Sequence, residues 1–105
     1  MVLTRDFKET IRARIECDPD FRKALLEEGV ECFLSGDVET GKSVLRDYIN
    51  ATIGFRELGV LTNKPSKSLM RMLGSKGNPQ VRNLSAIIGC LLEREGVHLK
   101  VQAVR

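Results

Sequence analysis

One side of a predicted helix at residues 65–73 carries side chains suited to binding a polyanion. These residues are Ser66, Lys67, Met70 and Arg71. The other side has the i, i+3, i+4 spacing of a buried stripe. It is formed by Leu69, Met72 and Leu73. No Asp or Glu occurs from residue 58 to residue 92, whereas a helix that only supports its neighbours usually interleaves acids with its bases. The sequence therefore predicts a basic surface without carboxylates.

A second candidate for phosphate chemistry is GDVETGKS at residues 36–43, which matches the phosphate-loop pattern G-x-x-x-x-G-K-[ST]. Asp37 and Glu39 would place two carboxylates beside the phosphates that such a loop must attract. The preceding ECFLS predicts the end of a helix rather than a buried strand, and no strand-helix alternation follows. Nucleotide binding is therefore the weakest alternative, and we expect Lys42 to be a solvated helix residue.

The metal-ligating and nucleophilic residue types form no recognisable constellation. Cys17, Cys32 and Cys90 include no CxxC pair, and the single His98 cannot complete a Cys/His zinc set. No Ser/His/Asp set can be singled out. We expect three reduced thiols, no metal, no cofactor, no catalytic residue and no enzymatic activity.

The charge of the chain is divided unevenly between its halves. Residues 1–53 hold 8 Lys/Arg against 11 Asp/Glu, a net charge of −3. Residues 54–105 hold 9 Lys/Arg against 3 Asp/Glu, a net charge of +6. This asymmetry predicts an electrostatic footprint on the C-terminal half of the domain.

Three helices are predicted in the N-terminal half of this 105-residue chain. The first spans residues 5–17 with Thr4 as its cap. The second starts at Asp18-Pro19, where a capping side chain precedes a proline, and we expect Gly29 to interrupt it. Asp37 caps the third, at residues 38–53. Residues 1–36 are assigned to an N-terminal helical extension, and residues 37–105 to one compact domain.

The basic surface is predicted to belong to a helix-turn-helix. A helical turn at residues 55–58 meets Gly59 as a breaker, and a loop at residues 61–64 leads to a second helix that Pro65 opens. The last helix, about residues 79–95, is expected to start at Asn78-Pro79. Such a pair of helices is typical of proteins that read DNA.

The tail at residues 97–104 alternates apolar and polar side chains through Ala103, which is the period of a strand. No other segment of the chain supplies a partner strand. A lone strand leaves its backbone groups unpaired, so we expect it to pair with its own twin in a dimer or with the sheet of a partner protein.

The run GFRELGVLTNKPSKSLMRMLGSKGNPQVRNLSAII, followed by the strand-like tail, resembles the Cro/repressor-type helix-turn-helix regulators. In particular, it is similar to the bacterial addiction-module antidote (antitoxin) subfamily, whose members typically show a KSLMRML…GNP core. The resemblance implies an all-α, five-helix lambda-repressor-like domain, here with an N-terminal helical extension and a short C-terminal strand. It also implies a homodimer that represses its own promoter, with a RelE-like ribonuclease toxin as partner.

The resemblance also assigns site residues. Base contacts are expected from the start and middle of the reading helix, at Ser66, Lys67, Ser68 and Arg71. Phosphate contacts are expected on either side of it, at Lys64, Ser75, Lys76, Asn78 and Arg82. Arg71 is the best candidate for base readout, because a guanidinium can meet guanine O6 and N7 with two hydrogen bonds.

The sequence thus predicts a cytoplasmic, sequence-specific regulator that binds double-stranded DNA. Two copies would bind an inverted repeat with their reading helices about 34 Å apart. The chain has no apolar run near 18 residues and starts without the apolar stretch of a signal peptide, so we expect no membrane association. The alternative is a protein-interaction module whose acidic N-terminal helices cover a basic partner, with little DNA binding.

Overall fold

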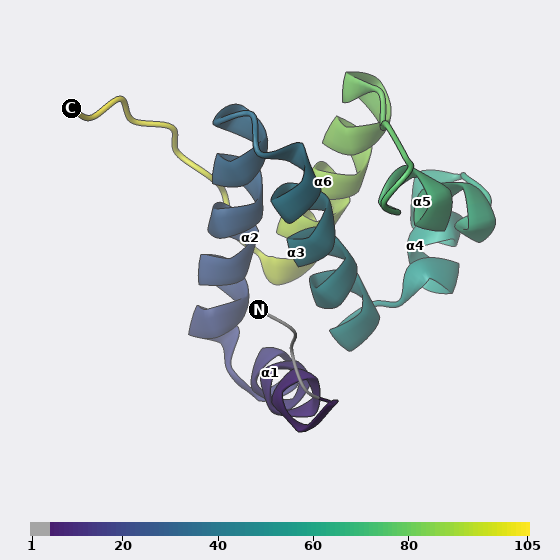
Figure 1. Cartoon of the computed structure of the whole chain (residues 1–105), viewed down its shortest axis with the longest axis horizontal. Helices are drawn as coiled ribbons and strands as arrows, with labels where there is room; N and C mark the ends of the chain where they lie inside the picture. Colours follow the sequence, from purple (N-terminus) through teal and green to yellow (C-terminus); the bar gives the residue numbers. More distant parts are fainter. Residues whose placement is uncertain (1–4) are drawn as a thin grey trace.

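Six α-helices form the described part of the computed structural model, which covers residues 5–105 (Figure 1). They are α1 (Arg5–Cys17), α2 (Pro19–Leu34), α3 (Val38–Ala51), α4 (Phe55–Thr62), α5 (Ser66–Met72) and α6 (Val81–Glu95). The all-α class predicted from the sequence is confirmed for these residues. Thr4, the predicted cap of the first helix, lies outside the described residues.

The two aspartates predicted as caps start α2 and α3. The Asp18 carboxylate accepts hydrogen bonds from the backbone N–H groups of Asp20 and Phe21, both at 3.1 Å, and Pro19 follows at the first helical position. The Asp37 carboxylate accepts from Thr40 N–H at 3.3 Å. Each cap satisfies a donor that the first turn of a helix leaves free.

The expected interruption of α2 at Gly29 is wrong, because α2 is continuous from Pro19 to Leu34. Gly29 is buried where α2 packs on α3. A Cβ at this position would lie 3.3 Å from Val44 Cγ1, tighter than most such contacts, so the missing side chain lets the two helices approach closely. Packing has overridden the weak helix propensity of glycine.

One apolar core joins all six helices. Its fully buried members include Ile15 of α1, Leu26 of α2, Leu45 of α3, Leu58 of α4, Leu69 of α5 and Ile87 of α6. In Figure 1, α2 and α3 lie side by side, α1 crosses below them, and α4 and α5 form a separate lobe beside α6. The core therefore connects the acidic N-terminal helices to the segment that carries the basic surface.

A partly buried polar network links α6 to the first three helices. The Arg22 guanidinium donates to Glu95 Oε1 at 2.8 Å and to the carbonyl of Ile15 at 2.9 Å, and the Tyr48 hydroxyl also donates to Glu95. Burial pushes the pKa of Glu95 upward, but the hydrogen bonds from Arg22 and Tyr48 outweigh it and leave the pKa below its usual value. Burial and the same carboxylate raise the pKa of Tyr48.

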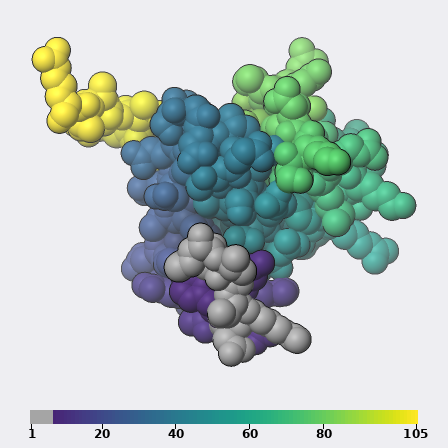
Figure 2. Space-filling view, in the orientation of Figure 1, coloured from purple at the N-terminus to yellow at the C-terminus, as the bar shows by residue number. Residues whose placement is uncertain are grey.

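The segment after α5 and the tail differ from their predictions. Helix α6 begins at Val81 rather than at Pro79, and Gln80 precedes it without a side-chain cap. Residues 97–105 form neither helix nor strand, and they leave the body of the molecule as an extension (Figure 2). A strand needs a second chain here, so its formation stays a prediction.

Replacing the partly buried carboxylate of Glu95 tests the polar network. We expect Glu95→Gln to lower the free energy of unfolding by roughly 2–3 kcal/mol at neutral pH. Because the pKa of Glu95 is lowered in the folded state, its stabilising contribution is complete above the unfolded value of about 4.3 and is lost as the pH falls through the folded value. The stability gap between wild type and Glu95→Gln should therefore narrow on acidification, as measured by urea unfolding at a series of pH values.

The exposed Glu93, two residues earlier on α6, provides the control. Glu93→Gln should leave the neutral-pH stability almost unchanged. A gap for Glu95→Gln that stays constant down to pH 3 would contradict the assignment of this carboxylate as an ionised partner of Arg22.

Candidate nucleic-acid interface

Helix α5 turns its apolar side into the core and its basic side to solvent. Leu69 and Leu73 have no exposed surface. Lys67 and Arg71 are exposed, and Met70 between them is 53% exposed. The helix therefore presents Lys67, Met70 and Arg71 on an outward face.

The cations around this face form no ion pair with any residue that the structure describes. The ion pairs of the described residues lie elsewhere, on α1, between α2 and α6, within α3, and between α6 and α4. None of them includes the five basic side chains predicted as site residues. These are Lys64, Lys67, Arg71, Lys76 and Arg82. Their charges are available to an external anion.

Gly59 does not end α4, contrary to the prediction, and the helix continues to Thr62. The reason for glycine here is space. A Cβ on Gly59 would lie 2.7 Å from the carbonyl oxygen of Lys64, because the chain folds back across α4 on its way to α5. Gly59 is thus a contact point between the two helices rather than a breaker.

The reversal between α4 and α5 takes three residues, 63–65. Asn63 adopts the left-handed conformation, with φ 56° and ψ 46°, which a short polar side chain tolerates. The N–H of Lys64 donates to the Gly59 carbonyl at 2.9 Å and so closes the end of α4. Pro65 precedes α5 as its cap residue, and the helix begins one residue later than predicted, at Ser66.

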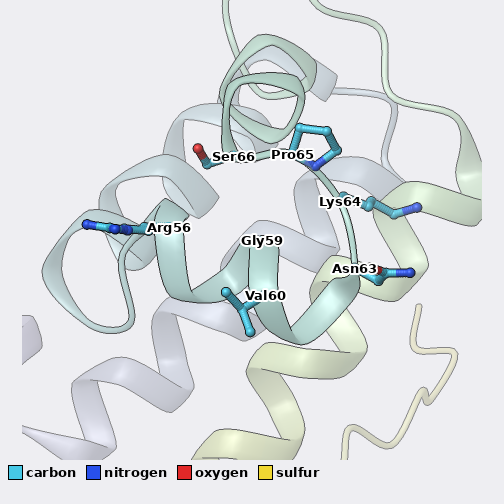
Figure 3. A pocket seen from close by; sticks show the side chains of 7 residues that line it. All are labelled: Arg56, Gly59, Val60, Asn63, Lys64, Pro65 and Ser66. Carbon is cyan, nitrogen blue, oxygen red and sulfur yellow. The ribbon is translucent and has the colours of Figure 1, made fainter.

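A shallow, open groove of about 490 Å³ lies along this reversal (Figure 3). It is lined by Arg56, Gly59, Val60, Asn63, Lys64, Pro65 and Ser66. Arg56 stands at one end of the groove and Lys64 at the other, with Ser66 at the start of α5 above them (Figure 3). Two basic side chains therefore flank the approach to α5.

Arg56 was missed by the sequence reasoning. It is exposed and directly precedes Glu57, which ended the carboxylate-free stretch used to define the surface. The signal that would have found it is its place one residue into α4. With Gly59, Val60 and Asn63 it has the i, i+3, i+4, i+7 spacing of one helix face, and that face of α4 leads to the reversal.

The turn that follows α5 is held from behind by two basic side chains of α3. Lys42 Nζ donates to the carbonyls of Gly74 at 2.9 Å and Gly77 at 2.7 Å, and Arg46 Nη1 donates to the carbonyl of Leu73 at 2.5 Å. The carbonyls at the C-terminal end of a helix carry partial negative charge, so cations are favoured there. We refer to Lys42 and Arg46 together as the α3 clamp.

The expectation that Lys42 is solvated is wrong, because the side chain is only 1% exposed. The GDVETGKS match to the phosphate-loop pattern forms no phosphate loop here. Residues 36–43 comprise a tight turn and the start of α3, and the lysine that would bind phosphate is committed to carbonyl oxygens of its own chain. Gly41 is buried against Phe33, and a Cβ there would lie 2.9 Å from the Phe33 ring.

The remaining predicted site residues lie along the segment from α5 to the start of α6. Ser66 and Ser68 are half-buried on α5, and Lys64 is half-buried before it. Four residues after α5 are exposed. They are Ser75, Lys76, Asn78 and Arg82. The predicted residues thus follow one stretch of the chain, residues 64–82, and the groove includes only Lys64 and Ser66 of them.

The thiols are unpaired. Cys17, Cys32 and Cys90 are free cysteines. Burial raises the pKa of Cys32 and of Cys90, which keeps both as thiols near neutral pH. Among residues 5–105, no group of three or more His, Cys, Asp or Glu side chains is arranged to hold a metal ion.

No family model, curated protein or solved structure matches this chain. Within the described residues, no helix has both the length and the apolar character needed to cross a bilayer. The function must therefore be argued from the geometry of the surface around α5.

Paired glycine substitutions test how α4 and α5 are joined. We expect Gly59→Ala to lower the free energy of unfolding by roughly 1–3 kcal/mol, because its Cβ would force the Lys64 backbone away. Gly89→Ala is the matched control on α6. Nothing lies within 4 Å of a Cβ at Gly89, so this change should stabilise the protein by about 0.5–1 kcal/mol. Urea unfolding of both variants measures the difference, and equal effects would contradict the close approach at Gly59.

Proposed function

We propose that this chain is a sequence-specific regulator that binds double-stranded DNA through α4 and α5, which act as a helix-turn-helix. The observation that carries the proposal is the outward face of α5, which is basic, free of carboxylates and unpaired within the described residues. The three-residue reversal between two short helices supports the proposal, because the helix-turn-helix motif joins two helices by a turn of about three to four residues. In that motif the second helix enters the major groove.

In this proposal α5 reads bases with Ser66, Lys67, Ser68 and Arg71. Arg71 is assigned the main base contact, since its planar guanidinium matches the two acceptors on the guanine edge. Met70, exposed beside it, is an apolar surface for the groove floor. The half-buried serines hydrogen-bond to bases or to the adjacent backbone.

Phosphate contacts flank the reading helix on both sides. Before α5 they come from Lys64 and from Arg56, which shares its groove. After α5 they come from Ser75, Lys76, Asn78 and Arg82. Such contacts fix the orientation of the protein on the duplex, while the base contacts select the sequence.

The regulator is proposed to act in the cytoplasm as a homodimer on an inverted repeat, because a two-fold pair of reading helices matches a two-fold DNA site. Residues 97–105 carry exposed apolar side chains, with Val101 80% and Val104 83% exposed. As the tail strand, these residues would pair with their twin. The roles of antitoxin and autorepressor, with a RelE-like toxin as partner, rest on the resemblance of residues 54–101 to the addiction-module antidotes.

Two substitutions separate base readout from phosphate contact. Arg71→Ala should reduce the preference for a duplex from the chain's own upstream region over a scrambled duplex by roughly 5- to 100-fold. Lys76→Ala should weaken both duplexes alike and flatten the salt dependence of log K by about one unit per bound chain. Competition binding over a range of salt concentrations measures both effects.

Lys23→Ala is the control for this series, since it removes one exposed positive charge from α2. It should change neither the preference nor the salt slope by a comparable amount. Identical behaviour of Arg71→Ala and Lys76→Ala would refute the division of labour. Failure of the wild type to bind any duplex at low salt would refute the proposed function and favour a protein-interaction module.

Removing residues 98–105 tests the proposed role of the tail. The truncation keeps Val97, whose N–H donates to the Leu92 carbonyl at 3.1 Å. The helical circular dichroism spectrum should be retained, because no core residue lies in the deleted segment. Sedimentation should show a dimer for the full chain and a monomer for the truncated one. A truncated chain that remains dimeric would remove the tail from the interface.

A further inference from the structure

The ammonium of Lys42 is buried and donates to backbone carbonyls, so it neither packs in the apolar core nor reaches the outward surface. We propose that Lys42 is a positioning residue that fixes the 74–77 turn and thereby places Lys76 for contact with a DNA phosphate. The inference rests on the proposed function, since it assigns a role within the same DNA-binding surface. It goes beyond that function because Lys42 itself cannot reach a ligand.

The Lys42 ammonium lies in a polar site inside the fold. Lys42 is the one buried charged side chain among the described residues. Its ammonium has three donors, and three acceptors surround it: the carbonyls of Gly74 and Gly77, and Glu39 Oε2 at 2.8 Å. Glu39 is 68% exposed, so water weakens its attraction. The two carbonyls are therefore the partners that hold the ammonium in place.

Burying the Lys42 ammonium costs desolvation free energy. A buried ammonium must be fully hydrogen-bonded, or its desolvation is strongly unfavourable. An apolar side chain of similar length would fill the same volume without that requirement. What the ammonium adds is a link from α3 to two carbonyls that lie 32 and 35 residues further along the chain.

The two carbonyls that Lys42 binds belong to the turn that follows α5. Gly74 and Gly77 bracket Ser75 and Lys76, whose side chains are exposed. Within the turn, Gly77 N–H donates to the Gly74 carbonyl at 3.0 Å. Lys42 bonds both ends of this short loop, so it fixes the backbone that carries Lys76 while leaving the Lys76 side chain free.

The 74–77 turn packs tightly against α5. A Cβ on Gly77 would lie 2.0 Å from the carbonyl oxygen of Arg71, far closer than non-bonded atoms approach each other. The turn is therefore folded directly against the end of α5. Gly77→Ala must displace it without altering any charge, which gives a second and independent way to perturb the position of Lys76.

The experiment compares Lys42→Met and Gly77→Ala with matched controls. Lys23→Met removes an exposed charge from α2, and Gly89→Ala adds a methyl group where nothing lies within 4 Å. Duplex binding is measured against salt concentration, well below the unfolding temperature of each variant. Lys42→Met and Gly77→Ala should each weaken binding roughly five- to tenfold at 0.1 M salt and flatten the salt slope by about one unit per chain, the value of one phosphate contact. The controls should do neither.

Double variants distinguish positioning from general destabilisation. If Lys42 acts through Lys76, adding Lys42→Met to Lys76→Met should cause little further loss of affinity. Lys64 lies before α5 and outside the clamped turn, so Lys42→Met should multiply the loss caused by Lys64→Met. Multiplicative losses in both pairs would overturn the proposal.

A measurement without DNA keeps this inference separate from the proposed function. Amide exchange and ¹⁵N relaxation of Ser75, Lys76 and Gly77 in the free protein should reveal faster motion in Lys42→Met than in Lys23→Met. An unchanged turn in Lys42→Met would overturn the positioning role, whether or not DNA binds. A loosened turn in a protein that binds no duplex would refute the proposed function, and with it the role of Lys76 toward phosphate.

Discussion

The structure around the basic surface depends on one constraint: α5, with seven residues, is too short to be stable as an isolated helix. It exists because its neighbours hold it. Leu69 and Leu73 are buried in the common core, the chain crosses α4 at Gly59, and the α3 clamp binds the carbonyls at its far end. These contacts involve the inward side and the two ends of α5, so Lys67, Met70 and Arg71 on its outward face remain exposed.

The distribution of charge follows from the same arrangement. The cations that stabilise the fold donate to backbone carbonyls or to the partly buried carboxylate of Glu95, as Lys42, Arg46 and Arg22 do. The cations around α5 have no such partners in the described residues. A protein that leaves like charges together on one face accepts their mutual repulsion, and an external polyanion would relieve it.

Local patterns in the sequence predicted most of the helices and the inward and outward sides of α5. Asp18 and Asp37 were recognisable as caps because capping is a contact between residues two or three apart. The roles of Lys42 and Gly59 could not be predicted in this way. Lys42 bonds to residues more than thirty positions away, and Gly59 is required by a backbone crossing that exists only after α5 has folded back. Lys42 lies in a match to the phosphate-loop pattern and Gly59 looks like a helix breaker, but each residue makes a tertiary contact instead.

The central claim is that the outward face of α5 reads a DNA sequence, and selection of bound molecules from a pool of random duplexes measures it most directly. We expect enrichment of an inverted repeat whose half-sites are about one helical turn apart, with guanine at the position that Arg71 contacts. Recovery of the pool unchanged, at salt concentrations low enough to retain non-specific binding, would contradict it. The chain would then be a helical module whose basic surface serves a different polyanion.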